Sequence, residues 1–128
     1  MEQSYPVAVS LMVFHDNELI FTSNGKWLYP LFDFEDFLKT HAFDVNRIYL
    51  NDKVIGKAAA MLIVRMGIQK VHGELMSEFG MKVFENFSIH YSFTTLVPRI
   101  SCKTEELLLN IDEPEAAYLI LCKRADRC

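Results

Sequence analysis

The 128-residue sequence has few of the residues that punctuate or cross-link a chain: five glycines, four prolines and three cysteines. It also lacks long hydrophobic runs. The longest ones, such as residues 7–14, fall far short of the roughly 20 residues that a membrane-spanning helix needs. Residues 1–6 (MEQSYP) lack the charged-then-apolar pattern of a secretion signal. We therefore expect a cytoplasmic protein with no membrane partner.

An excess of basic charge is missing as well. Thirteen Lys and Arg residues face 17 Asp and Glu residues, for a formal net charge of −4. Proteins that bind nucleic acid usually carry a basic stripe, so we expect no nucleic-acid partner. A hydrophobic fraction of 51% with 23% charged residues is typical of a globular chain, and the length suits a single domain over residues 1–128.

The cysteines and histidines form no metal-binding pattern. Cys102, Cys122 and Cys128 are odd in number and contain no C-x-x-C, which indicates reduced thiols. The tripeptide HGE at 72–74 matches half of the zinc-deaminase signature. It lies in a predicted strand and no P-C-x-x-C follows, so a chance match is the simpler interpretation. We expect no metal and no cofactor.

Hydrophobic periodicity predicts strands that alternate with helices. The predicted strands cover residues 7–14, 18–22, 47–50, 70–74 and 89–93, and the first two form a hairpin through the turn at 15–17. The predicted helices begin near Pro30, at Asn51–Asp52 with Gly67 as the C-terminal stop, at Ser77, near Ser101 and at Asp112 with Pro114 in the first turn. This order predicts an α/β fold, with a largely parallel sheet covered by helices on both faces.

The segment DKVIGKAAA at 52–60 is the most unusual local feature. In the predicted helix, Lys53 and Lys57 stand one turn apart near the N-terminal end, where cations are unfavourable. Free backbone N–H groups plus two ammonium groups would suit a phosphate or carboxylate. The alternative is two solvated lysines balanced by the capping Asp52. Ser77, which begins the next predicted helix at the end of a strand, is added to the candidate ligand-binding residues Asp52, Lys53 and Lys57.

A second candidate group follows the fifth predicted strand. Cys102 lies near a predicted helix start, where the pKa of a thiol falls, and Glu105 lies one turn away as a proton acceptor or a cap. These two residues are the candidate catalytic pair. The alternative is an ordinary buried cysteine.

Four segments resemble a family of small bacterial and archaeal domains of unknown function with a cytidine-deaminase-like fold. They are DKVIGKAAA (52–60), MGIQKV (66–71), LVPRI (96–100) and DEPEAAY (112–118), and the similarity covers residues 9–121. The resemblance implies a three-layer α/β/α sandwich with a mixed five-stranded sheet and a pocket where deaminases hold zinc. It also implies that zinc ligands are missing, because DKV (52–54) stands in place of H-x-E and LMSEF (75–79) in place of P-C-x-x-C. The family's C-P-M-E segment is matched only at Cys102 and Glu105.

Three functions remain open. The preferred one is zinc-independent binding of an anionic small molecule, a nucleotide or a sugar phosphate, by Asp52, Lys53, Lys57 and the helix start. The second is a thiol-dependent enzyme with Cys102 as nucleophile and Glu105 or Asp52 handling protons. The third is a non-catalytic module that forms homo-oligomers or binds a partner.

Overall fold

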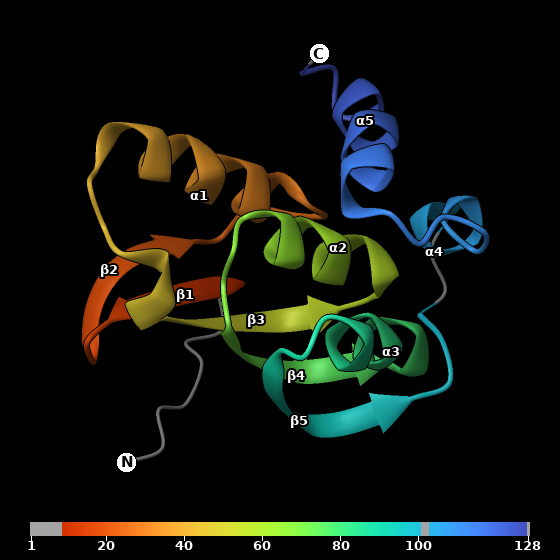
Figure 1. Cartoon of the computed structure of the whole chain (residues 1–128), viewed down its shortest axis with the longest axis horizontal. Helices are drawn as coiled ribbons and strands as arrows, with labels where there is room; N and C mark the ends of the chain where they lie inside the picture. The colour runs from red at the N-terminus through yellow and green to blue at the C-terminus, as the bar shows by residue number, and fades with distance from the viewer. Residues whose placement is uncertain (1–8, 101–102, 128) are drawn as a thin grey trace.

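One mixed sheet forms the centre of the protein, with the strand order β2-β1-β3-β4-β5 (Figure 1). The computed structural model describes residues 9–100 and 103–127. The strands are β1 (Leu11–His15), β2 (Glu18–Ser23), β3 (Ile48–Ile55), β4 (Lys70–Ser77) and β5 (His90–Val97). β1 is antiparallel to both β2 and β3, whereas β3, β4 and β5 are parallel. The prediction of a mixed five-stranded α/β fold is confirmed.

The hairpin forms where the turn residues predicted it. His15 pairs with Glu18, which leaves Asp16 and Asn17 as the two-residue loop. Both loop residues have positive φ, 50° for Asp16 and 69° for Asn17. Asp and Asn tolerate this conformation better than most residues, and two such angles in succession match the right-handed twist of the flanking strands.

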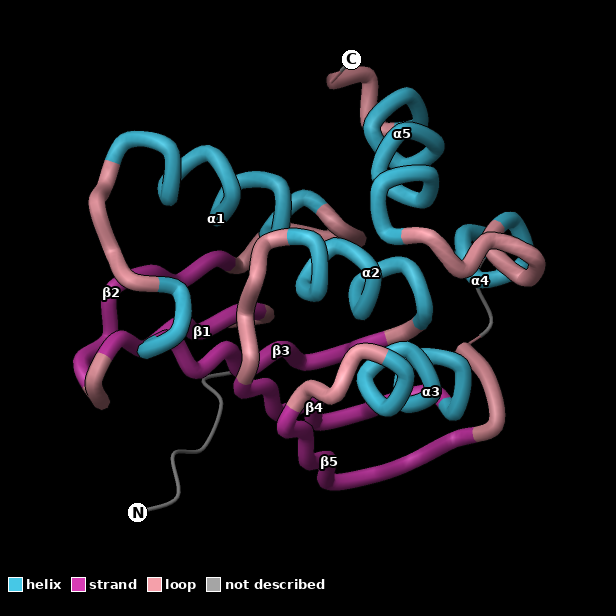
Figure 2. Tube along the Cα trace, in the orientation of Figure 1, coloured by secondary structure: helices cyan, strands magenta, loops and turns pink. Residues whose placement is uncertain are grey.

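The helices are α1 (Tyr29–Thr40), α2 (Lys57–Arg65), α3 (Glu78–Asn86), α4 (Lys103–Leu107) and α5 (Pro114–Arg124), with a short 3₁₀ turn at Val45–Arg47. α2 contacts both α1 and α3, and α4 and α5 pack on α2 (Figure 2). The connections that carry α1, α2 and α3 all step along the sheet in one direction. Because such crossovers share one hand, they place their helices on one face. Within residues 9–100 and 103–127, the expected second helical layer is not found.

The face of β4 and β5 away from the helices carries a polar ladder. His72 Nδ1 lies 2.7 Å from Ser92 Oγ, and His72 Nε2 lies 3.0 Å from Glu74 Oε2. Thr94 Oγ1 donates to the same Glu74 oxygen at 2.6 Å. The HGE tripeptide thus lies within β4, as predicted, and its side chains pair across neighbouring strands.

The main core lies between the sheet and the helices. The Ala58–Ala60 run and Ile63 of α2 are buried there, since small side chains let the helix approach the strands closely. The largest fully buried side chains include Leu11, Leu31, Phe32, Phe34, Ile48, Leu50, Ile55, Met61, Ile63, Ile68, Met76 and Phe84. No helix of the described part of the chain is long and apolar enough to cross a bilayer.

The predicted start of the second helix is wrong. Asn51 and Asp52 do not begin a helix, because β3 continues to Ile55 and pairs with both β1 and β4. α2 begins at Lys57 with Gly56 as its N-cap, and ends close to Gly67, whose φ is +85° as a helix stop requires. Neighbouring strands supply the hydrogen bonds of residues 51–55. The local sequence pattern of a helix cap contains no information about such distant partners.

The C-terminal helices differ in detail from the prediction. Glu113, not Asp112, is the N-cap of α5, and Pro114 lies in the first turn as expected. The Asp112 carboxylate does not cap the helix and instead pairs with Lys57 Nζ at 3.1 Å. α4 begins at Lys103, and the predicted start at Ser101 lies outside the described residues. Ser77 is confirmed as the cap of α3, where its Oγ accepts from the Gly80 N–H at 3.0 Å.

Candidate functional site

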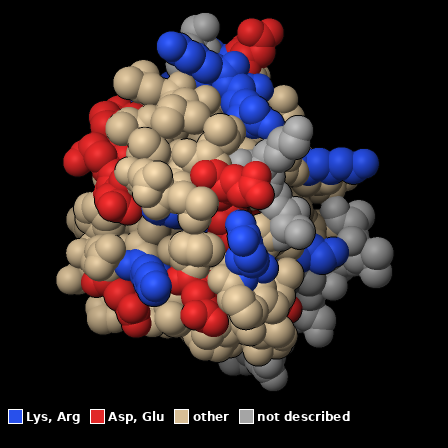
Figure 3. Space-filling model, turned by 90° about the vertical axis from the view of Figure 1, so that its right-hand side faces the viewer, with Lys and Arg blue, Asp and Glu red and all other residues tan. Residues whose placement is uncertain are grey.

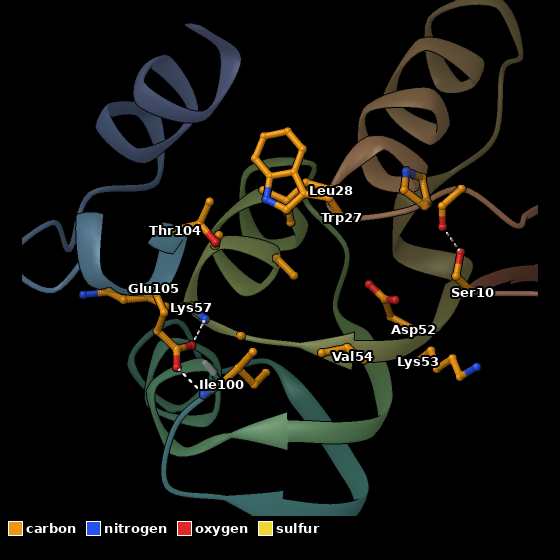
Figure 4. A pocket seen from close by; sticks show the side chains of 15 residues that line it. Ser10, Trp27, Leu28, Asp52, Lys53, Val54, Lys57, Ile100, Thr104 and Glu105 are labelled. Carbon is orange, nitrogen blue, oxygen red and sulfur yellow. Dashed lines mark hydrogen bonds between the residues drawn. The ribbon is translucent and has the colours of Figure 1, made fainter. Parts of the chain in front are cut away.

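A cavity of about 310 Å³ opens at the carboxyl end of β3 (Figure 4). Its walls come from the segment before α1, from β3, from the first turn of α2 and from α4, so they join parts of the chain that are distant in sequence. The lining residues are Ser10, Gly25, Trp27, Leu28, Pro30, Asp52, Lys53, Val54, Gly56, Lys57, Ala58, Ala59, Ile100, Thr104 and Glu105. Carboxyl ends of parallel strands are where ligands collect in open α/β sheets.

Asp52 is the polar group that this cavity presents most directly. Its side chain is 8% exposed and points into the hollow below Trp27 (Figure 4). Burial raises the pKa of the carboxyl to about 7, and hydrogen bonds from the backbone N–H groups of Val54 and Lys53 offset this only in part. At neutral pH the group therefore exchanges between the acid and the carboxylate, each of which can bind a polar ligand atom.

The two lysines do not form the expected pair. Lys53 lies in β3, and its ammonium group points away from the hollow (Figure 4). Lys57 is 5% exposed, but its Nζ donates to Asp112 Oδ1 at 3.1 Å and to the carbonyl oxygen of Leu109 at 3.3 Å. Lys57 therefore ties the α4–α5 connection to α2, and neither ammonium group faces the cavity.

Glu105 caps the N-terminus of α2 from a distant part of the chain. This carboxylate is 2% exposed and accepts three hydrogen bonds. Oε2 accepts from the Lys57 backbone N–H and from Ser77 Oγ, both at 2.9 Å, and Oε1 accepts from the Ile100 N–H at 2.7 Å. A negative charge at the positive end of a helix is favourable, so Glu105 replaces the side-chain cap that Gly56 cannot provide.

Gly56 leaves room for this cap. A Cβ atom at position 56 would lie 2.7 Å from Glu105 Oε2, closer than real Cβ atoms approach an oxygen. Ser77, a predicted ligand-binding residue, belongs to the same network, because it donates to Glu105 and accepts from the N–H of Gly80. Ser77 is fully buried and is not among the lining residues of the cavity.

Comparison with protein families gives one assignment. Residues 6–124 match the family described as TM1506, a domain of unknown function (DUF1893). The chain belongs to the DUF1893 family. A solved DUF1893 protein (TM1506) from Thermotoga maritima has the same fold, with a TM-score of 0.79 and 24% identity over 91% of this chain and 80% of that one. No curated protein matches the sequence.

The cysteines of this DUF1893 chain depart from expectation where the structure describes them. Cys122 is buried on α5 and is disulfide-bonded, so the prediction of three reduced thiols is wrong for this residue. Cys102, the candidate nucleophile, and Cys128 lie outside the described residues. Glu105 is the predicted proton acceptor for Cys102. Both of its carboxylate oxygens already accept hydrogen bonds, from the N–H groups of Lys57 and Ile100 and from Ser77 Oγ.

Trp27 is a lining residue that the sequence analysis missed. Its φ of +57° is costly for a bulky residue, by about 1–3 kcal/mol, and its ring contacts Tyr29 edge-on at a centroid distance of 5.2 Å. Trp27 follows SNGK at 23–26, a run of turn-forming residues that breaks the chain between β2 and α1. No local pattern shows that this break lies beside β3 and α4 in the DUF1893 fold.

Charge and metal ligands give two further observations. Within the described part of the chain, no group of three or more His, Cys, Asp or Glu side chains is arranged to hold a metal ion. Figure 3 shows one face of the molecule, on which the acidic and basic side chains of the described residues are interspersed without a continuous basic surface.

Proposed function

We propose that this DUF1893 protein binds a small organic molecule in the cavity at the end of β3 and does so without zinc. The observation that carries the proposal is the buried Asp52 carboxyl directed into a hollow of about 310 Å³ whose other walls are mainly apolar. Ligand sites are typically apolar concavities of this size or larger with a few fixed polar groups. A buried acid with a strongly raised pKa in a cavity is a recognised sign of a functional site.

The proposal includes a cytidine-deaminase-like fold for the chain. The sheet order β2-β1-β3-β4-β5 and the helices that follow β3 and β4 support the sheet and one helical layer of that fold, and residues 9–100 and 103–127 do not supply the second layer. The resemblance sets the start of α2 against the H-x-E segment of deaminases and the start of α3 against their P-C-x-x-C segment. Here those helix starts hold Gly56 with Lys57 and Ser77 with Glu78. The Glu105 carboxylate bridges them, which favours a binding role over hydrolysis at a bound zinc hydroxide.

A fragment screen by thermal shift tests the proposal, with a variant that fills the cavity. Val54 lines the hollow and is 44% exposed, so Val54→Trp places bulk at the mouth at little cost to folding. Leu119→Trp on α5 is the matched control, because Leu119 is 55% exposed and is not among the lining residues. Fragments that bind here raise Tm with concentration in the wild type and in the control.

The Val54→Trp variant should lose these shifts while its own unfolding remains cooperative. Two results would overturn the proposal. One is a screen in which no fragment raises Tm at millimolar concentration. The other is a set of shifts that are equal in Val54→Trp and Leu119→Trp, because the fragments would then bind elsewhere.

A further inference from the structure

We infer that the ligand of this cavity is a compact organic cation, an amine or guanidine with a small apolar body, whose charged nitrogen pairs with Asp52. The inference rests on the proposed function and adds the charge class of the ligand. It differs from the anionic ligand that the sequence favoured. The argument depends on which charged groups face the hollow.

Asp52 has no cationic partner within the described part of the chain. The groups that act on its carboxyl are the two backbone N–H groups of Val54 and Lys53, and burial outweighs both. A buried carboxylate without a nearby cation is costly, and a cation brought by a ligand would remove that cost. An anion in the same place would add repulsion in an environment of low dielectric constant.

Among the side chains that the structure describes, the other charged groups that line the cavity are turned away or already bonded. On β3, Lys53 points away from the hollow, and on α2, Lys57 Nζ is held by Asp112 and Leu109. On α4, the carboxylate of Glu105 accepts three hydrogen bonds. In the segment before α1, Lys26 is exposed and is not among the lining residues. Of the charged side chains in the described part of the chain, Asp52 is therefore the one whose charge a ligand in the cavity meets.

The walls suit the apolar part of such a ligand. Leu28, Pro30, Ala58 and Ala59 provide apolar surface on two sides. Trp27 also lines the cavity. Of the aromatic side chains, tryptophan makes the strongest cation–π interactions. The volume of about 310 Å³ lies at the lower end of the range for ligand pockets, which indicates a small molecule and leaves little room for a sugar phosphate attached to a base.

A matched ligand series tests the charge class by titration calorimetry. Benzylamine, benzyl alcohol and benzoate share one ring and differ in charge, and phenyl phosphate and inorganic phosphate represent anions. At about pH 8, benzylamine should bind at least tenfold more tightly than the alcohol, since hydrogen bonds to charged groups are worth about 1.5–3 kcal/mol. The anions should show no binding.

In Asp52→Asn, the affinity for benzylamine should lie within about twofold of the affinity for benzyl alcohol. The control Glu106→Gln, at an exposed residue of α4, should change neither affinity. In the wild type, benzylamine affinity should be constant from about pH 7 to about pH 8.5, where Asp52 is ionised and the amine still carries its proton. Below about pH 7 it should fall by up to tenfold per pH unit, because binding must then remove a proton from Asp52.

The outcomes separate the two proposals. Three results would overturn the inference of a cationic ligand while leaving the cavity as a binding site. They are equal affinities for the amine and the alcohol, a higher affinity for phenyl phosphate than for benzylamine, and an amine affinity that is unchanged in Asp52→Asn. If no member of the series binds, the inference of a cationic ligand is wrong. The fragment screen with Val54→Trp then decides separately whether the cavity binds anything.

Discussion

Glu105 and Lys57 are 48 residues apart in sequence, yet a carboxylate oxygen of Glu105 accepts the backbone N–H of Lys57 at 2.9 Å. This bond joins α4 to the first turn of α2 and to one wall of the cavity. The same carboxylate reaches Ser77 at the end of β4 and Ile100 after β5. Three separate segments are thus held at one point, and the stability of the site depends on a single buried acid.

Glu105→Gln should lower the free energy of unfolding by about 1–3 kcal/mol. Both carboxylate oxygens accept hydrogen bonds, so an amide of the same shape must place its NH₂ group against a donor. Urea unfolding at neutral pH measures the loss. Glu106→Gln is the matched control and should stay within about 0.5 kcal/mol, because Glu106 is exposed. Equal effects at both positions would contradict the capping role.

Gly56→Ala should destabilise the protein by about 1–3 kcal/mol, because its Cβ would lie 2.7 Å from Glu105 Oε2. A double-mutant cycle with Glu105→Ala identifies the cause. Once the longer side chain is removed, the added methyl group has space, and the cost of Gly56→Ala should fall by more than half. A cost that is unchanged in the Glu105→Ala background would show that the backbone, and not the carboxylate, requires glycine.

Asp52→Asn should stabilise the protein above neutral pH relative to the wild type. The pKa of Asp52 is raised from 3.8 to about 7 in the folded state, so the folded protein binds the extra proton. This contribution to stability is fully present below about pH 4 and is lost as the pH rises to 7. The variant's advantage should grow over that interval by a few kcal/mol and then level off. Urea unfolding from pH 4 to pH 8 measures it, and a constant difference would show that the carboxyl titrates normally.

Lys53→Met and Lys57→Met should leave benzylamine affinity within about twofold. Neither ammonium group faces the hollow, and methionine preserves the apolar stem of each side chain. Lys57→Met should also lower stability by no more than about 1 kcal/mol through its ion pair, since Asp112 is largely exposed. Asp112→Asn is the matched change on the other side of that pair. A large loss of affinity in either lysine variant would mean that the ammonium groups do reach the ligand.

Local patterns in the sequence determined most of the elements. Asp16 and Asn17 specified the hairpin turn, Pro30 lies in the first turn of α1, Ser77 caps α3 and Gly67 follows the end of α2. Each of these signals works through the residue's own backbone preferences or through hydrogen bonds a few residues away. Such effects are present in any fold, and for that reason they can be predicted without one.

Only the tertiary structure decided where α2 begins and which charges face the cavity. Strand pairing extended β3 through Asp52 to Ile55, because β1 and β4 satisfy its backbone. Glu105 capped the helix across 48 residues, and Asp112 turned Lys57 away. These partners are distant in sequence and meet only after the sheet has formed, so no local pattern could assign the charge of the site.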